Sequence, residues 1–201
     1  MSDAVLPAPP ARRVRLATAA DAPALRDIYA PIVRDTATSF ELEPPDAAEM
    51  ARRLDKIMQR YPWLVCEEAG EVVGYAYGSE HRARPAYQWS VEVSVYVRPG
   101  QKRGGVGRLL YDALLRCLAA QGYYTAVAGI TLPNEASVGF HRALGFAPVG
   151  TYPKLGYKLG AWHDTGWLAR PLRPYADAPA PPRTLVELAA SAEWPADLPR
   201  P

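Results

Sequence analysis

One stretch of the chain, residues 94–107, combines the end of a strand, a glycine-rich turn and the start of a long helix. Its sequence is SVYVRPGQKRGGVG. Glycines let the backbone approach an anion closely, and the first N–H groups of a helix have no partner within it. Lys102, Arg103 and Arg108 add positive charge. The stretch therefore predicts a pyrophosphate-binding loop, with an ordinary glycine cap as the alternative.

Two common phosphate motifs do not fit this loop. A P-loop has Lys-Ser or Lys-Thr after its last glycine, whereas Val106 follows Gly105. The dinucleotide fingerprint needs a further glycine three residues after Gly107, where Leu110 stands. The loop must belong to another class of phosphate site.

Composition narrows the classes of protein. The 201 residues suit one domain, 49% of them are hydrophobic, and the formal net charge of +2 argues against nucleic-acid binding. No apolar run approaches the roughly 18 residues of a membrane span, and the N-terminal residues do not form a secretory signal. Cys66 and Cys117 stand in apolar segments, which predicts core thiols and a cytoplasmic protein. No His, Cys or carboxylate cluster has metal-ligand spacing, so no metal site is predicted.

Prolines divide the chain into a compact middle and two loose ends. We predict a flexible N-terminal tail at 1–12, a domain at 13–172 and a Pro-rich C-terminal tail at 173–201, with only a marginal helix at 184–192. Periodicity within the domain predicts a mixed α/β fold. The expected strands are 14–17, 63–68, 72–77, 89–97, 124–130, 147–152 and 164–172. Helices are expected after Asp21, around 46–58, at 106–121 and from about 134 to 144.

Two segments resemble the coenzyme motifs of the GNAT superfamily of N-acetyltransferases. Residues 102–107, KRGGVG, resemble its [Gln/Arg]-x-x-Gly-x-[Gly/Ala] loop, with Lys102 in place of the usual Gln or Arg. Residues 134–146, NEASVGFHRALGF, resemble the Asn-x-x-Ala-x-x-x-Tyr-x-x-x-Gly-Phe segment, with Ser137 and His141 replacing Ala and Tyr. The order of predicted elements is also that of the acetyltransferase fold.

Four further segments are similar to phosphinothricin N-acetyltransferases and their relatives that acetylate methionine sulfone and sulfoximine. They are RYPWLV at 60–65, ARPAYQW at 83–89, VEVSVYV at 91–97 and KLGAWHD at 158–164. The resemblance implies acetyl-CoA as cosubstrate, a small amino-acid acceptor, direct transfer in a ternary complex, and a homodimer. Two alternatives stay open: acetylation of another small amine or a protein N-terminus, and a non-catalytic acyl-CoA-binding domain.

The same resemblance assigns the coenzyme contacts. The strand edge at Val95, Tyr96 and Val97 is expected to hydrogen-bond the pantetheine arm, and Asn134 to bind the pantetheine side of the coenzyme. The pyrophosphate is expected on the loop formed by Lys102, Arg103, Gly104, Gly105, Val106, Gly107 and Arg108.

Glu92 is the candidate general base. Alternation puts it on the polar side of its strand with Ser90, Ser94 and Tyr96, and it matches the catalytic glutamate of the phosphinothricin enzymes. A glutamate ordinarily titrates near 4.3, so removing a proton from an ammonium needs a raised pKa or a water relay. The alternative is a solvated or salt-bridged strand residue.

The remaining candidates are a proton donor and the substrate-binding residues. His141 is expected to protonate the leaving thiolate or orient the substrate, with Tyr111 as a competing acid and His163 as a structural residue. Guanidinium groups bind carboxylate and phosphinate oxygens bidentately. We therefore expect a substrate pocket from the cationic and aromatic residues Arg84, Tyr87, Phe40, Arg60 and Lys158.

Overall fold

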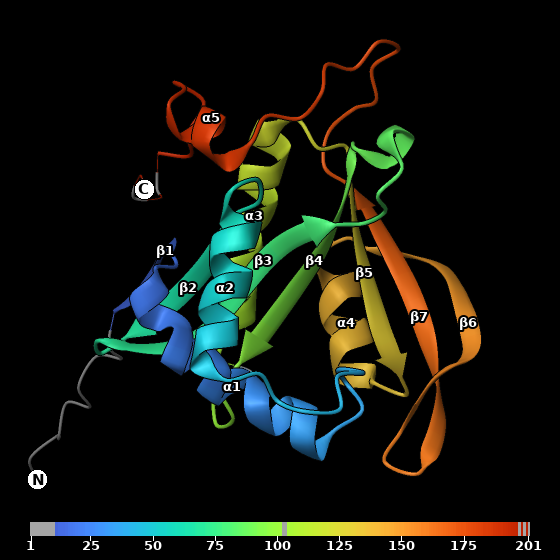
Figure 1. Cartoon of the computed structure of the whole chain (residues 1–201). Helices are drawn as coiled ribbons and strands as arrows, with labels where there is room; N and C mark the ends of the chain where they lie inside the picture. The colour runs from blue at the N-terminus through green and yellow to red at the C-terminus, as the bar shows by residue number, and fades with distance from the viewer. Residues whose placement is uncertain (1–10, 102–103, 197, 199, 201) are drawn as a thin grey trace, which may run out of the picture.

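Seven strands form one mixed sheet in the order β1-β2-β3-β4-β5-β7-β6 (Figure 1). The computed structural model describes residues 11–101, 104–196, 198 and 200. The strands are β1 Arg12–Leu16, β2 Trp63–Glu68, β3 Glu71–Glu80, β4 Ser90–Val97, β5 Thr125–Leu132, β6 Ala147–Lys158 and β7 Ala161–Pro171. The helices are α1 Ala22–Asp35, α2 Ala47–Met58, α3 Val106–Gln121, α4 Glu135–Ala143 and α5 Leu185–Ala189, with short 3-10 turns η1 Ala19–Asp21 and η2 Pro85–Tyr87.

The helices cover the two faces of the sheet unequally (Figure 1). Helix α3 packs its apolar side on one face, together with side chains of β3, β4 and β5, in a core that includes Val91, Leu114 and Ile130. Helices α1 and α2 cover the opposite face over β2 and β3, around Leu25 and Trp63. Strands β2 and β3 are therefore covered on both faces.

The sheet divides at its centre. The parallel pairing of β4 with β5 covers only Ser90–Glu92 against Thr125–Val127, and beyond it the two strands diverge (Figure 1). In contrast, β3 pairs with β4 as far as Val97. The β5-facing edge of Val93–Val97 therefore presents backbone groups to an opening, and Glu92 lies where that opening begins.

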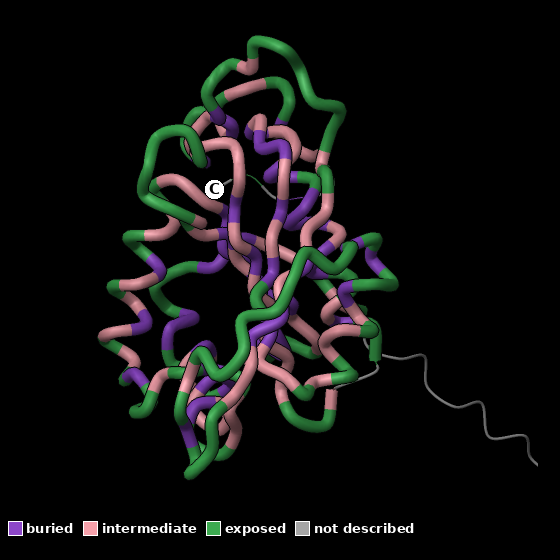
Figure 2. The backbone as a smooth tube through the Cα atoms, turned by 90° about the vertical axis from the view of Figure 1, so that its right-hand side faces the viewer, coloured by how far each residue is buried: buried purple, intermediate pink, exposed green. Residues whose placement is uncertain are grey.

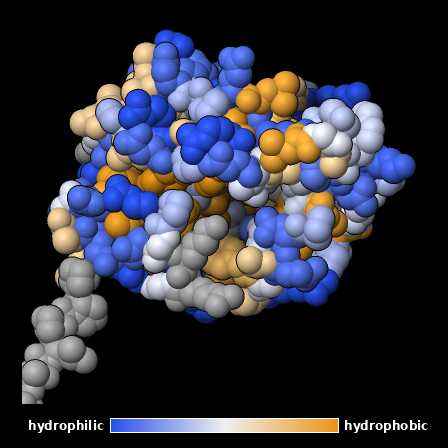
Figure 3. Space-filling view, turned by 90° about the horizontal axis from the view of Figure 1, so that it is seen from below, coloured by the Kyte–Doolittle hydropathy of each residue, from blue (hydrophilic) through white to orange (hydrophobic). Residues whose placement is uncertain are grey.

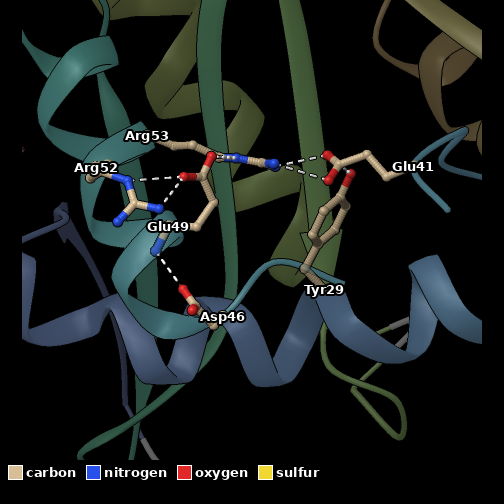
Figure 4. A network of polar contacts seen from close by, with 6 residues as sticks. All are labelled: Tyr29, Glu41, Asp46, Glu49, Arg52 and Arg53. Atoms are coloured by element: carbon tan, nitrogen blue, oxygen red, sulfur yellow. Dashed lines mark hydrogen bonds and ion pairs between the residues drawn. The ribbon is translucent and has the colours of Figure 1, made fainter. Parts of the chain in front are cut away.

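The loop between α1 and α2 is held by a polar network (Figure 4). The guanidinium of Arg53 donates to both carboxylate oxygens of Glu41, at 2.7 and 3.0 Å, and to Glu49 at 2.8 Å. Tyr29 donates its hydroxyl to Glu41 at 2.9 Å, and Asp46 caps α2 through the amide of Glu49. These bonds hold the loop between α1 and α2 in place.

Strands β6 and β7 form a long hairpin whose surface is apolar and exposed. Nearly all of β6 is exposed (Figure 2). Six large apolar side chains on this hairpin are each more than half exposed: Val149, Tyr152, Leu155, Tyr157, Leu159 and Trp162. This amount of exposed apolar surface on adjacent strands is typical of an interaction face.

The C-terminal segment differs from the loose tail expected from its prolines. Four of its apolar residues enter the α3 core: Leu185, Leu188, Trp194 and Leu198. Thr184 and Glu187 form a capping box that starts α5, and Trp89 donates its indole N–H to Ala180 O at 2.9 Å. Proline restricts the backbone without preventing packing, and here the apolar residues between the prolines determine the result.

Candidate active site

The carboxylate of Glu92 is paired with an imidazole. Its Oε1 lies 2.9 Å from His81 Nδ1 and 3.7 Å from the guanidinium of Arg82. Strand β3 continues three residues beyond the expected Tyr77, and Ser79 stands opposite Glu92. The chain leaving β3 therefore brings His81 beside Glu92. Both side chains are partly exposed, at 16% for His81 and 30% for Glu92, so the pair is accessible to a ligand.

Aromatic rings enclose this pair. The His81 ring meets Tyr87 and Trp167 edge-on, with centroids 5.9 and 5.7 Å away. The Arg82 guanidinium lies 5.8 Å from the Trp167 ring. Trp167 projects from β7 across Gly129 of β5, where an added Cβ would come within 3.3 Å of the ring. The small residue at 129 thus allows the indole to form one wall of the site.

A cavity of about 180 Å³ is lined by neighbours of the pair, although not by His81 or Glu92 themselves. Its lining includes Arg82 and Tyr87, which also contact the pair, and the expected substrate residues Arg84 and Arg60. Arg60 also donates to Tyr123 OH at 3.2 Å. The cavity has the positive charge and aromatic surface suited to a small anionic ligand.

The remaining two expected substrate residues lie elsewhere. Phe40 sits against Gly156 of β6 and 6.3 Å from the His163 ring. Lys158 is only 5% exposed, and its Nζ donates to Val33 O and Ser39 O, both at 2.6 Å. Burial lowers the pKa of this lysine. The expectation that Lys158 contacts substrate is therefore corrected: the amine joins β6 to the end of α1 and the loop that follows.

The backbone that could hold the coenzyme lies along the opening. Val95, Tyr96 and Val97 occupy the part of β4 that β5 leaves unpaired. Gly105 adopts φ +84° as the N-cap of α3, and the first bond of the helix runs from Leu109 N to Gly105 O. The amides of residues 106–108, which precede that bond, are oriented toward the N-terminus of α3, where an anion is favoured.

The structure describes only part of the expected pyrophosphate loop at residues 102–108. Lys102 and Arg103 lie outside the described residues. Arg108 is largely exposed, 3.7 Å from Asp112, and Gly104 O accepts a hydrogen bond from Arg12. At Gly107 an added Cβ would come within 3.4 Å of the Phe140 ring, so this glycine serves the close packing of α3 on α4. From below, apolar side chains appear in a hollow bordered by polar ones (Figure 3).

Asn134 begins α4 rather than pointing freely into the opening. Its Oδ1 accepts a hydrogen bond from the amide of Ser137 at 3.1 Å, as an N-cap does. The cap places α4 beside β5, at the side of the opening (Figure 1). Its expected contact with the pantetheine side of the coenzyme stays a prediction.

His141 lies in the core, with both ring nitrogens in contact with polar atoms. It is 4% exposed; Nδ1 is 2.8 Å from Ser137 O, and Nε2 is 3.1 Å from Tyr111 OH. A carbonyl can only accept, so Nδ1 carries the proton and Nε2 accepts from the tyrosine. Burial lowers the pKa of His141 and raises that of Tyr111. This geometry favours a structural role for both residues over the expected proton donation.

The other expectations can be compared with the structure directly. His163 donates its Nε2–H to Lys158 O, 3.0 Å away, within the β6–β7 hairpin. Among the described residues, no group of three or more His, Cys, Asp or Glu side chains could hold a metal ion. In the same part of the chain, no helix is long and apolar enough to cross a membrane.

Sequence reasoning missed His81 and Trp167 as site residues. The expected end of the strand at Tyr77 left His81 in a loop of unknown direction. Once β3 extends to Glu80, its antiparallel register with β4 brings His81 near Glu92. Trp167 gave no local signal because its position depends on the pairing of β5 with β7, which aligns it with Gly129.

Comparisons with known proteins agree with this architecture. The Acetyltransferase (GNAT) domain family matches residues 14–167. Phosphinothricin N-acetyltransferase of Streptomyces viridochromogenes is 44% identical over 170 residues, which cover 85% of this chain and 91% of that protein. The L-methionine sulfoximine/L-methionine sulfone acetyltransferase of Pseudomonas paraeruginosa is 39% identical, over 83% of this chain and 98% of that one.

A solved structure extends the likeness to three dimensions. The phosphinothricin acetyltransferase of Sinorhizobium meliloti, determined with acetyl-CoA, superposes with a TM-score of 0.77 at 38% identity. The match covers 80% of this chain and 88% of that one. The expected fold is confirmed, and the chain belongs to the GNAT acetyltransferase family.

Proposed function

We propose that this protein transfers the acetyl group of acetyl-CoA to the free amine of a small amino acid or analogue of the phosphinothricin or methionine sulfone/sulfoximine type. The observation that carries the proposal is the position of Glu92. This carboxylate lies where β4 and β5 begin to diverge, 3.7 Å from Arg82, which lines a cavity together with Arg84. The names of the relatives support the same acceptor class.

Each part of the proposed active site has its own role in the reaction. The free edge of Val95–Val97 holds the pantetheine arm and donates to the acetyl carbonyl, while the amides at the start of α3 hold the pyrophosphate. Acetyl-CoA supplies an acyl group activated as a thioester. Arg84 and Tyr87 bind the acceptor, and removal of its ammonium proton depends on Glu92. The amine then attacks within a ternary complex without an acyl-enzyme.

A thiol-release assay tests this function. Acetyl-CoA is supplied with phosphinothricin, methionine sulfone, methionine sulfoximine, ordinary amino acids or polyamines. We expect saturable release with the amino-acid analogues. Saturable release confined to polyamines would contradict the amino-acid class, and no release with any amine would favour a non-catalytic acyl-CoA-binding domain. A peptide with a free N-terminus tests the remaining acetyltransferase alternative.

We further propose a cytoplasmic homodimer, as in the resembling enzymes. The exposed apolar face of the β6–β7 hairpin supports the dimer, because Tyr157 and Trp162 would be covered by a second copy. The buried thiols of Cys66 and Cys117 are consistent with a reducing compartment. Light scattering after size exclusion should give twice the chain mass, and Trp162→Glu should reduce that mass to one chain.

A further inference from the structure

We propose that His81 is the proton acceptor of the active site and that Glu92 acts by orienting and charging its ring. This assignment rests on the proposed function, since it concerns the same reaction. It begins from the 2.9 Å contact between His81 Nδ1 and Glu92 Oε1. A carboxylate accepts, so Nδ1 carries the proton and the lone pair of neutral imidazole lies on Nε2.

The ring is held in one orientation while Nε2 is left unengaged. Tyr87 and Trp167 each contact the ring edge-on, and the Glu92 contact restrains its rotation. Among the described residues, no hydrogen-bond partner takes Nε2, and this atom is not among the buried side-chain atoms that lack a partner. Nε2 is therefore accessible, and two neighbours of the ring, Tyr87 and Arg82, also line the cavity.

The chemistry favours imidazole over carboxylate as the acceptor. A base works best when its pKa is near the working pH, and histidine ordinarily titrates near 6.5 against 4.3 for glutamate. The charged and titratable groups around the ring are Glu92 from β4, the neighbouring Arg82 and Tyr87 from η2. The Glu92 carboxylate attracts an imidazolium, whereas Arg82, 3.7 Å from the same Oε1, repels one.

The proton path can be written in full. His81 Nε2 takes one proton from the substrate ammonium and later releases it to water. The free amine forms a bond to the thioester carbon, the carbon–sulfur bond breaks, and the second proton of the amine ends on the sulfur of CoA. Glu92 stays ionised throughout. The net products are the acetamide, the free thiol and one proton in solution.

Three variants separate this relay from simple packing. His81→Asn keeps an N–H donor near the Nδ1 position but cannot titrate, and His81→Phe keeps the ring without either nitrogen. We expect kcat at pH 7 to fall at least about tenfold in both, with the acidic limb of the kcat/KM profile lost. In His81→Ala, added imidazole should restore part of the rate. Acetyl-CoA affinity should be unchanged in all three.

A readout without turnover tests the pair in the ligand-free enzyme. Nitrogen-15 NMR of the neutral His81 ring should show the proton on Nδ1 in the wild type and a mixture of both tautomers in Glu92→Gln, because an amide can donate as well as accept. The same tautomer mixture in both proteins would overturn the pairing. Retention of kcat and of the pH profile by His81→Asn, while Glu92→Gln loses turnover, would overturn the relay but leave the proposed function intact. Absence of thiol release from the wild-type enzyme would instead remove the function.

Discussion

His81 and His141 each lie within hydrogen-bonding distance of another ionisable side chain, but their environments differ. His81 is partly exposed, contacts an anion through Nδ1 and keeps Nε2 accessible. His141 is buried among Phe140, Phe146 and Tyr111, and both of its nitrogens contact protein atoms. A proton acceptor needs one unengaged nitrogen and a route to water, and a core residue needs neither. The contacts of His81 therefore indicate a catalytic role more directly than the position of His141 in the motif does.

The largest effect that distinguishes the two histidines concerns stability. His141→Ala removes a buried ring and leaves Tyr111 OH without its partner, which should lower the free energy of unfolding by about 3 kcal/mol. As a control at the third histidine, His163→Ala affects a partly exposed ring with one hydrogen bond and should cost about 1 kcal/mol. Chemical denaturation measures both values.

The opposite result would restore the catalytic role expected from the motif. If His141→Phe keeps the free energy of unfolding near the wild-type value but loses turnover, then His141 donates a proton and must exchange its bond to Tyr111 for one to the thiolate.

A smaller effect is expected in the binding of the acceptor. Arg84→Ala should raise the KM of the amino-acid substrate about tenfold, as one charged hydrogen bond is lost, while the KM of acetyl-CoA changes little. Initial rates with each substrate varied in turn give both constants. Equal increases in the two constants would indicate general damage and remove Arg84 from the acceptor site.

The smallest effect is in the pH dependence of stability. Burial lowers the pKa of His141 below its ordinary 6.5, so below that pH the unfolded chain binds a proton that the folded chain does not. Stability from this group is complete above pH 6.5 and is lost as the pH falls toward the folded pKa, by at most about 1.4 kcal/mol per pH unit. His141→Gln should unfold with a shallower dependence between pH 6.5 and 5. Identical slopes would show that His141 titrates normally.

The sequence predicted most of the fold because its local signals were strong. Helix α3 was expected at 106–121 and has those bounds, since Gly105 and Gly122 end the amphipathic pattern on both sides with φ of +84° and +104°. β6 was expected to end at Tyr152 but continues to Lys158. Pro153 normally weakens a strand assignment, yet β6 is an edge strand, where proline is tolerated.

The site was less predictable because its contacts join distant segments. Glu92 became a candidate from alternation within one strand and from the family resemblance, and its catalytic role stays a prediction. The position of His81 depends on the register of β3 with β4, and that of Lys158 on carbonyls more than one hundred residues away. Spacing along one chain contains neither relation.

The central claim is that removal of the substrate's proton depends on Glu92, and turnover of Glu92→Gln tests it most directly. The amide keeps the size of the side chain but loses the charge. With acetyl-CoA and the best acceptor, kcat should fall at least about tenfold while the Kd of acetyl-CoA holds, and the exposed control Glu43→Gln should match the wild type. Turnover of Glu92→Gln equal to the wild type would contradict the account.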